Sequence, residues 1–155
     1  MKKRRASGKN DQRKSQATCA CACSCLRQAA RAITQLYDEA FRPMGCRATQ
    51  FGILGVAEEL GAVTLSELAE ETVTDRTTLT RNLRLLERKG LIGLECGQDR
   101  RERRVCLTQR GSRVLQTVRP AWIRVQEKVI HRVGRRRFER IVSDLSAVIE
   151  AAQTL

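Results

Sequence analysis

Two helix-start signals that lie close together constrain the fold more than any other feature of this sequence. Thr64 and Glu67 have the spacing of a capping box, in which the threonine hydroxyl accepts from the glutamate amide and the carboxylate reaches back to the threonine amide. This box predicts a short helix over residues 65–71. After a brief turn, Asp75 can cap a second helix, which Gly90 ends. Two short helices joined by a tight turn form a helix-turn-helix.

The remaining periodicity predicts further helices and one β-hairpin. The expected elements are helices from residue 19 to a stop at Pro43, over 48–60, over 108–133 with Pro120 inside it, and after Gly134, and strands over 92–96 and 103–107. Hydrophobic residues make up 41% of the chain but aromatic residues only 3%, which favours packed aliphatic helices over a β-sandwich. We therefore expect a mainly α fold with a small β-wing. In the helix over 108–133, the stripe expected to face the core comprises Leu115, Val118, Trp122, Val125 and Val129.

The charge of the chain predicts a polyanionic partner. Lys and Arg number 30 against 17 acids, which gives a net charge of +13. Residues 1–16 hold seven bases and one acid with almost no apolar side chains, and this composition predicts a disordered basic arm. Nucleic acid is the first candidate partner and an anionic membrane surface the second. No apolar run approaches the roughly 18 residues of a spanning helix, and no secretory signal is recognised, so we expect no membrane partner and a cytoplasmic location.

The second helix of the pair has one apolar and one basic side. On a helical wheel Leu79, Leu83 and Leu86 share the side that faces the core. The opposite stripe has Thr and Arg but no acid: Thr77, Arg81, Arg84 and Arg88, flanked by Thr78 and Thr80. Arg can bind guanine through two hydrogen bonds, and Thr can contact a thymine methyl group or a phosphate. The stripe is therefore predicted to read the DNA major groove; a solvated helix face is the alternative.

The tip of the predicted hairpin is also basic. Residues 97–104 contain four arginines, among them Arg100, Arg101 and Arg103. Such a tip fits a narrow minor groove, whose negative potential attracts inserted Arg side chains. The alternative is a charged edge that prevents aggregation.

Three ordered sets of residues give the sequence a specific resemblance. The run from Asp75 to Leu83, with Leu86 and Gly90-Leu91-Ile92, resembles the recognition helix of the MarR family. The run from Asp99 to Arg104, followed by Leu107-Thr108 and Gly111, resembles the wing of that family with its D-x-R-x-R core. Ala29-Ala30-Arg31-Ala32-Ile33 and Leu36-Tyr37 resemble its first helix. These sets occur in family order, and the resemblance spans residues 23–155.

The resemblance implies a winged helix-turn-helix in an intertwined homodimer. Residues 17–155 would form one domain, with dimerisation helices in 17–45 and 108–155 and the winged helix-turn-helix in 46–107. The family commonly represses transcription at a pseudo-palindromic operator and is released by a small ligand or by thiol oxidation. Carried over by position, Thr77, Thr78 and Arg81 would contact bases, Arg101 would enter the minor groove, and Asp99 would order the wing.

The seven cysteines include a cluster at alternate positions: Cys19, Cys21, Cys23 and Cys25. On a helix Cys19 neighbours Cys23 and Cys21 neighbours Cys25, with the first pair expected inward. In an extended segment, several thiolates could converge on one soft metal or metalloid ion. No other cofactor is expected. Reduced thiols are expected in the cytosol, and Cys46, Cys96 and Cys106 are expected to be structural.

The organic-hydroperoxide repressor branch of the family carries a reactive cysteine near this cluster. Cys23 falls on that position, and Tyr37 matches one of the tyrosines that hydrogen-bond it. Ala48 replaces a second tyrosine, and no cysteine follows Cys106 to act as a distal resolving thiol. Apolar packing, redox sensing and soft-metal sensing therefore remain as three interpretations of the cluster.

Other functional classes find less support. The sequence has no glycine-rich phosphate loop, no G-x-S-x-G elbow, and His131 is its one histidine, so an enzyme is not expected. A non-specific DNA-binding or membrane-surface basic protein is the alternative. The main prediction is a sequence-specific regulator of transcription that binds double-stranded DNA. We expect a repressor that is released by an unidentified small molecule, by thiol oxidation or by a soft metal.

Overall fold

The computed structural model describes residues 21–96 and 103–154, except for the side chains of residues 95, 96 and 103. The chain divides into two compact units, residues 1–36 and residues 37–155, which are described separately. The predicted arm over residues 1–16 lies outside the described residues. Among the described residues, no helix is both long enough and apolar enough to cross a membrane.

The described part of the first unit is helical. It belongs to α2 (Ala22–Phe41), which continues into the second unit. All residues of α2 are described, and only the last of them, Phe41, is buried. Ile33 and Leu36 are exposed although they belong to the apolar stripe of the helix.

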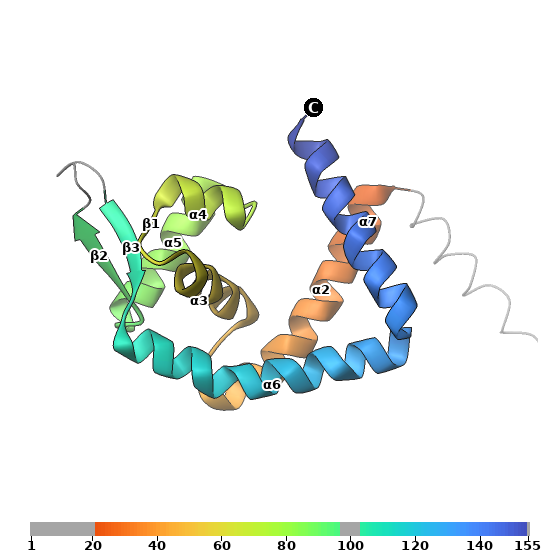
Figure 1. The fold of residues 1–155 in the computed structure, drawn as a ribbon, viewed down its shortest axis with the longest axis horizontal. Helices are drawn as coiled ribbons and strands as arrows, with labels where there is room; N and C mark the ends of the chain where they lie inside the picture. Colours follow the sequence, from red (N-terminus) through yellow and green to blue (C-terminus); the bar gives the residue numbers. More distant parts are fainter. Residues whose placement is uncertain (1–20, 97–102, 155) are drawn as a thin grey trace, which may run out of the picture. The chain divides into compact units, whose positions relative to one another are not determined.

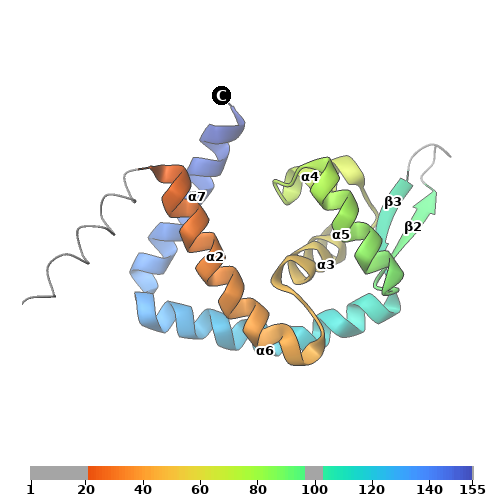
Figure 2. The same cartoon turned by 180° about the vertical axis from the view of Figure 1, so that it is seen from behind.

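The second unit contains the predicted helix-turn-helix and hairpin, with close agreement in their bounds (Figure 1). After the end of α2 come η1 (Arg42–Met44), α3 (Ala48–Leu60), β1 (Val63–Thr64), α4 (Leu65–Glu71), α5 (Arg76–Arg88), β2 (Ile92–Cys96), β3 (Arg103–Leu107), α6 (Gln109–Val133) and α7 (Arg135–Gln153). The turn from α4 to α5 is best followed from behind (Figure 2). The fold is thus mainly helical with a small antiparallel sheet, as predicted.

The sheet has a third strand that the sequence analysis did not predict. Its order is β1-β3-β2, with antiparallel neighbours. Val63 lies opposite Val105, and Leu94 also lies opposite Val105 from the other side. A two-residue strand has too few positions to show a period of two, and it exists because β3 supplies its hydrogen-bonding partner.

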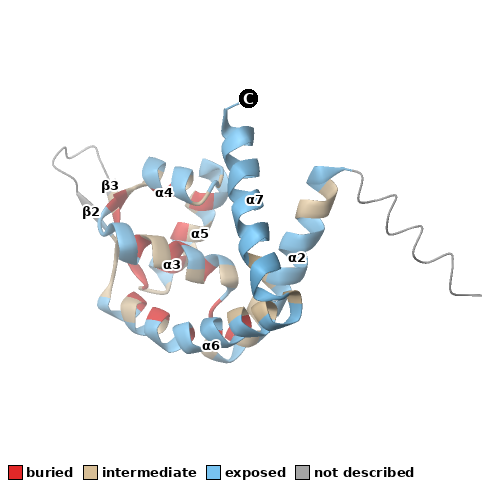
Figure 3. Cartoon of the chain, turned by 45° about the vertical axis from the view of Figure 1, so that its right-hand side comes forward, coloured by how far each residue is buried: buried red, intermediate tan, exposed pale blue. Residues whose placement is uncertain are grey.

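The main core lies between the helix-turn-helix and the sheet. Leu79, Leu83 and Leu86 are buried, as the helical wheel predicted. They pack in one cluster with Leu54 of α3 and Leu115 of α6. Figure 3 shows this concentration of buried positions around α3 and α5. The core therefore holds the opposite, polar side of α5 toward solvent.

A smaller core forms where η1 meets α6, and it corrects one prediction. Phe41 and Cys46 pack there against Val118 and Ala121. Trp122, predicted to face inward, is 36% exposed and instead stacks its ring on Phe51 at a centroid separation of 6.2 Å. Small Ala121 lets the helices approach more closely than the indole would, so the tryptophan lies at the edge. Val129, also predicted inward, is half-buried.

The start of α6 approaches the sheet very closely. A Cβ atom at Gly111 would lie 2.0 Å from the carbonyl oxygen of Leu91, so no larger residue fits without a backbone shift. Thr108 caps the helix by accepting from the Gly111 amide, and its hydroxyl donates to the Gly90 carbonyl at 2.7 Å. These contacts join α6 to the end of α5.

The last helix leaves its apolar stripe uncovered. All residues of α7 are described, and none of them is buried (Figure 3). Five apolar side chains of the stripe have exposed fractions between 39% and 47%: Ile141, Val142, Leu145, Val148 and Ile149. A continuous exposed apolar stripe of this kind is typical of surfaces that mediate protein–protein contacts.

Candidate nucleic-acid interface

The capping box at Thr64 is present in the structure. The Thr64 hydroxyl accepts from the Glu67 amide at 3.2 Å, and Glu67 Oε2 accepts from the Thr64 amide at 2.8 Å. Hydrogen bonds from Thr64 lower the pKa of Glu67. These bonds fix where α4 begins.

The turn and the second cap set the direction of α5. Asp75 Oδ1 accepts from the Thr78 amide at 2.8 Å, and hydrogen bonds from Thr78 lower the pKa of Asp75. The Arg76 guanidinium donates to the Ser66 hydroxyl at 2.7 Å, which ties α5 to α4. Val73 adopts a φ of 46°, a conformation that is strained for a β-branched residue.

The predicted DNA-reading stripe is exposed on α5. Thr77, Thr78, Arg81 and Arg84 are all exposed, and Arg88 lies on the same surface one turn further on. Arg81 and Arg84 form no ion pair with another described residue. Their guanidinium groups are therefore available to a ligand, although the exposed Glu87 lies beside Arg84 at the edge of the stripe.

Thr80 differs from the other members of this stripe. Its hydroxyl donates to the Arg76 carbonyl at 2.6 Å, a bond made within the helix. It lines a hollow of about 250 Å³ between α5 and the sheet, together with Leu83 and Leu94. A hydroxyl engaged in this way offers its oxygen lone pairs to a partner but not its proton.

The wing is only partly described. Asp99, Arg100 and Arg101 lie outside the described residues. The backbone of Arg103 belongs to β3 and lies opposite Cys96 at one end of the sheet. Arg104 was counted in the tip, but its guanidinium donates to the Ala62 carbonyl at 3.2 Å beside β1.

Sequence reasoning missed a polar junction at the end of α5. Gln50 is only 4% exposed, and its side-chain oxygen accepts from the Arg47 amide at 3.3 Å and from Lys89 Nζ at 3.4 Å. Lys89 also donates to the Gly45 carbonyl at 3.3 Å. This junction connects the end of the recognition helix with the segment that follows α2. A polar residue on a helix gives no sequence signal for such a role, because the buried position is created by tertiary packing.

The cysteine cluster departs from two predictions. Cys21 and Cys23 are exposed free thiols, so Cys23 does not face inward. Cys25 is disulfide-bonded rather than reduced. Cys19 lies outside the described residues.

The other cysteines and Tyr37 are involved in local packing. Cys46 is buried, and this burial raises the pKa of its thiol. Cys106 is half-buried on β3, and the side chain of Cys96 is outside the described set. The Tyr37 hydroxyl donates to Gln126 of α6, so its observed partner is not the Cys23 thiol that the resemblance implied.

With this geometry established, comparison with known proteins identifies the family. A model described as MarR family matches residues 45–102. A crystal structure of the Mycobacterium tuberculosis transcriptional regulator MosR in complex with DNA is 41% identical, with a TM-score of 0.79, over 86% of this chain and 97% of that one. The chain belongs to the MarR family of winged helix-turn-helix transcription regulators. This is a family of DNA-binding regulators, not of enzymes.

Further relatives agree with this assignment. A second MosR structure is 39% identical, with a TM-score of 0.76, over 88% of this chain and 98% of that one. A mutant of Escherichia coli MarR, complexed with operator DNA, shares the fold at 21% identity and a TM-score of 0.74 over 79% of this chain and 89% of that one. The uncharacterised regulator YwoH of Bacillus subtilis is 25% identical over 68% of this chain and 77% of that protein.

Proposed function

We propose that this MarR-family regulator is a homodimeric repressor that recognises a pseudo-palindromic operator. The observation that carries the proposal is the exposed, acid-free stripe on α5, which the leucine core holds toward solvent. The relative with 41% identity was crystallised in complex with DNA, which supports DNA binding by this chain. Two such helices related by a twofold axis would contact half-sites about 10 bp apart.

The proposed contacts follow the exposed side chains. Thr77, Thr78, Arg81 and Arg84 would contact bases or backbone in the major groove, with Thr80 beside them as an acceptor. Arg100, Arg101 and Arg103 would enter the minor groove, with Asp99 ordering the wing. The winged helix-turn-helix would occupy residues 46–107.

The proposed dimer uses the two uncovered stripes. Residues 17–45 and 108–155 would supply the dimerisation helices, because α2 and α7 both expose apolar side chains within one protomer. Burying such stripes against a second copy is the common solution for a chain of this kind. DNA recognition would then depend on the dimer, since one protomer reads one half-site.

The proposed signal is oxidation of the N-terminal thiols. Two thiols would form a disulfide while a hydroperoxide is reduced to an alcohol and water. Cys21 and Cys23 are exposed and free, and Cys25 is already in a disulfide, so thiol–disulfide chemistry is within reach of this cluster. The described residues contain no group of three metal ligands, although Cys19 lies outside them.

Selection from a random-sequence duplex pool, followed by fluorescence anisotropy at fixed salt, tests the repressor proposal. We expect an enriched pseudo-palindrome that binds at least about a thousandfold more tightly than its scrambled form. Equal affinity for the two duplexes would mean that the protein is a non-specific DNA binder. Repression itself is measured with a reporter gene placed behind the selected operator.

A variant in which Cys19, Cys21, Cys23 and Cys25 are all replaced by Ser tests the signal. Treatment with an organic hydroperoxide should weaken operator binding by the wild type but not by the variant, and dithiothreitol should restore it. A matched variant, Cys106→Ser, should respond as the wild type does. Release by arsenite but not by hydroperoxide would indicate a soft-metal sensor instead, and an unchanged response in the fourfold variant would exclude the cluster.

A further inference from the structure

The corner between α6 and α7 holds a second concentration of positive charge. Five arginines lie within residues 132–140: Arg132, Arg135, Arg136, Arg137 and Arg140. All five are exposed, and Glu139 is the one acid in the same stretch. None of the five forms an ion pair or hydrogen bond with another described residue. We call these five residues the corner cluster.

Local folding does not account for the corner cluster. Arg135, Arg136 and Arg137 form the first turn of α7, where the partial positive charge of the helix end disfavours bases. The first turn has no acid, and Gly134 at the N-cap provides no side-chain hydrogen bond. The three charges therefore oppose the helix dipole and repel one another. A negatively charged partner would remove both costs.

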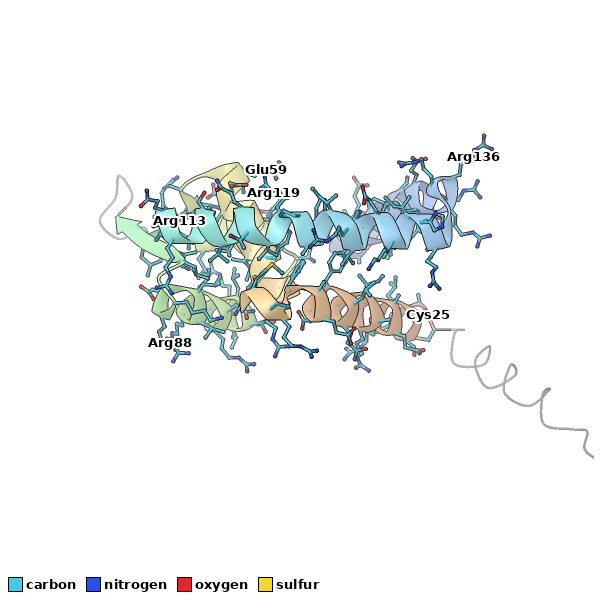
Figure 4. All side chains as sticks on the ribbon, turned by 90° about the horizontal axis from the view of Figure 1, so that it is seen from below. Cys25, Glu59, Arg88, Arg113, Arg119 and Arg136 are labelled. Carbon is cyan, nitrogen blue, oxygen red and sulfur yellow. The ribbon has the colours of Figure 1, made fainter. Side chains whose placement is uncertain are left out.

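The operator read by the same protomer does not account for it either. The end of α5 joins the start of α6 through the bond from Thr108 to the Gly90 carbonyl. The corner cluster lies at the other end of α6, whose 25 residues at about 1.5 Å each span roughly 37 Å. Figure 4 shows Arg88 and Arg136 near opposite ends of α6. Salt screens charges over about 8–10 Å, so an operator held by α5 of the same protomer would not neutralise these arginines.

We propose that the corner cluster binds the phosphate backbone of a second DNA duplex, so that one dimer holds two DNA segments. Arginine forms paired hydrogen bonds with phosphate oxygens, and an arginine patch complements the charge of a duplex. The patch has no asparagine, glutamine or exposed aromatic side chain, so the contact is independent of base sequence. The inference rests on the proposed operator binding, because the first duplex occupies α5.

A capture experiment with the full-length protein tests this inference. The selected operator duplex is immobilised, protein is loaded and quantified, and a fluorescent 30-bp duplex of scrambled sequence is then added at about 0.1 M salt. Wild-type protein should retain the second duplex, with retention falling steeply as salt rises. Arg135, Arg136 and Arg137 are replaced together by Gln. The control replaces Arg27, Arg31 and Arg124, which are exposed elsewhere, by Gln.

The corner variant should load on the operator as the wild type does but capture roughly tenfold less second duplex. The slope of log binding constant against log salt concentration should become shallower by about one for each arginine that contacts phosphate. Removing bases from the first turn of α7 should preserve or raise the unfolding temperature, which excludes misfolding as the cause. The inference is overturned if the corner variant captures as much second duplex as the wild type. It is also overturned if the control variant loses as much capture as the corner variant.

Operator loading and lipid binding separate this inference from the proposed function. Failure of the wild type to load on the operator would contradict the proposed function, whereas normal loading without capture would contradict only this inference. Binding of the wild type and of the corner variant to vesicles containing one-third phosphatidylserine is measured in parallel. Cluster-dependent binding to the vesicles without capture of the duplex would also overturn it, in favour of a membrane surface.

Discussion

At the scale of single residues, Arg81 is the most direct test of DNA reading. It is exposed on the acid-free side of α5 and has no ion-pair partner among the described residues. Arg81→Ala should weaken operator binding by about 1–3 kcal/mol and relax discrimination at one base pair in each half-site. Anisotropy with operators substituted at each position measures both effects. Arg124→Ala, which removes an exposed arginine from α6, should change neither; a uniform loss across all sequences would make Arg81 a backbone contact.

Val73 offers a stability test at the same scale. It has a φ of 46° in the turn between α4 and α5, and its side chain is 57% exposed. A left-handed conformation costs a non-glycine residue about 1–2 kcal/mol, whereas glycine adopts it freely at the price of greater freedom in the unfolded chain. Val73→Gly should therefore stabilise the protein by roughly 0.5–1 kcal/mol, measured by urea unfolding at fixed protein concentration. Destabilisation would show that the exposed valine makes a contact that outweighs its strain.

At the scale of elements, the N-cap of α5 should make stability depend on acid pH. The folded pKa of Asp75 is lowered by hydrogen bonds from Thr78, so the unfolded chain binds a proton at a higher pH than the folded one. The contribution of the cap is therefore fully present above the unfolded pKa of about 4 and is lost as the pH falls through the folded pKa. Urea midpoints measured between about pH 6 and pH 2.5 should fall over this window.

Asp75→Asn separates the titration of this cap from its structural role. Asparagine caps a helix about as well as aspartate but does not titrate. The variant should keep most of its stability at neutral pH and lose stability less steeply in acid. An identical acid profile for the two proteins would show that carboxylates other than Asp75 determine the transition.

At the scale of the whole molecule, the uncovered stripe of α7 predicts an obligate dimer. Leu145 lies in the middle of this stripe. Leu145→Asp should convert the dimer into monomers of 17.5 kDa and abolish operator binding, because a charge cannot be buried unpaired at an interface. Light scattering and anisotropy on the same sample measure both. Ser143→Asp adds the same charge on the other side of α7 and should leave the dimer intact. A Leu145→Asp monomer that holds the operator tightly would refute the coupling of assembly to recognition.

The sequence by itself determined most of the helices and strands and most of the candidate interface. The helix-turn-helix was predictable because its caps are local: Thr64 with Glu67, and Asp75 with Thr78, are each three residues apart. The polar stripe of α5 was predictable because helical geometry separates it from the leucines, whatever those leucines pack against. The strands over 92–96 and 103–107 were predictable because they are short strand-like segments on either side of a charged hairpin tip.

Only the tertiary structure decided features that depend on distant contacts. Strand β1 exists because Val105 lies opposite Val63, and Ala121 replaces Trp122 in the core because η1 approaches α6 closely there. Gln50 gains its role from Lys89, which is 39 residues away. The exposure of Cys23 and of the α7 stripe also could not be predicted, because it depends on what the tertiary structure places beside them. An amphipathic pattern specifies that a face needs a partner, but the partner comes from elsewhere in the chain or from another molecule.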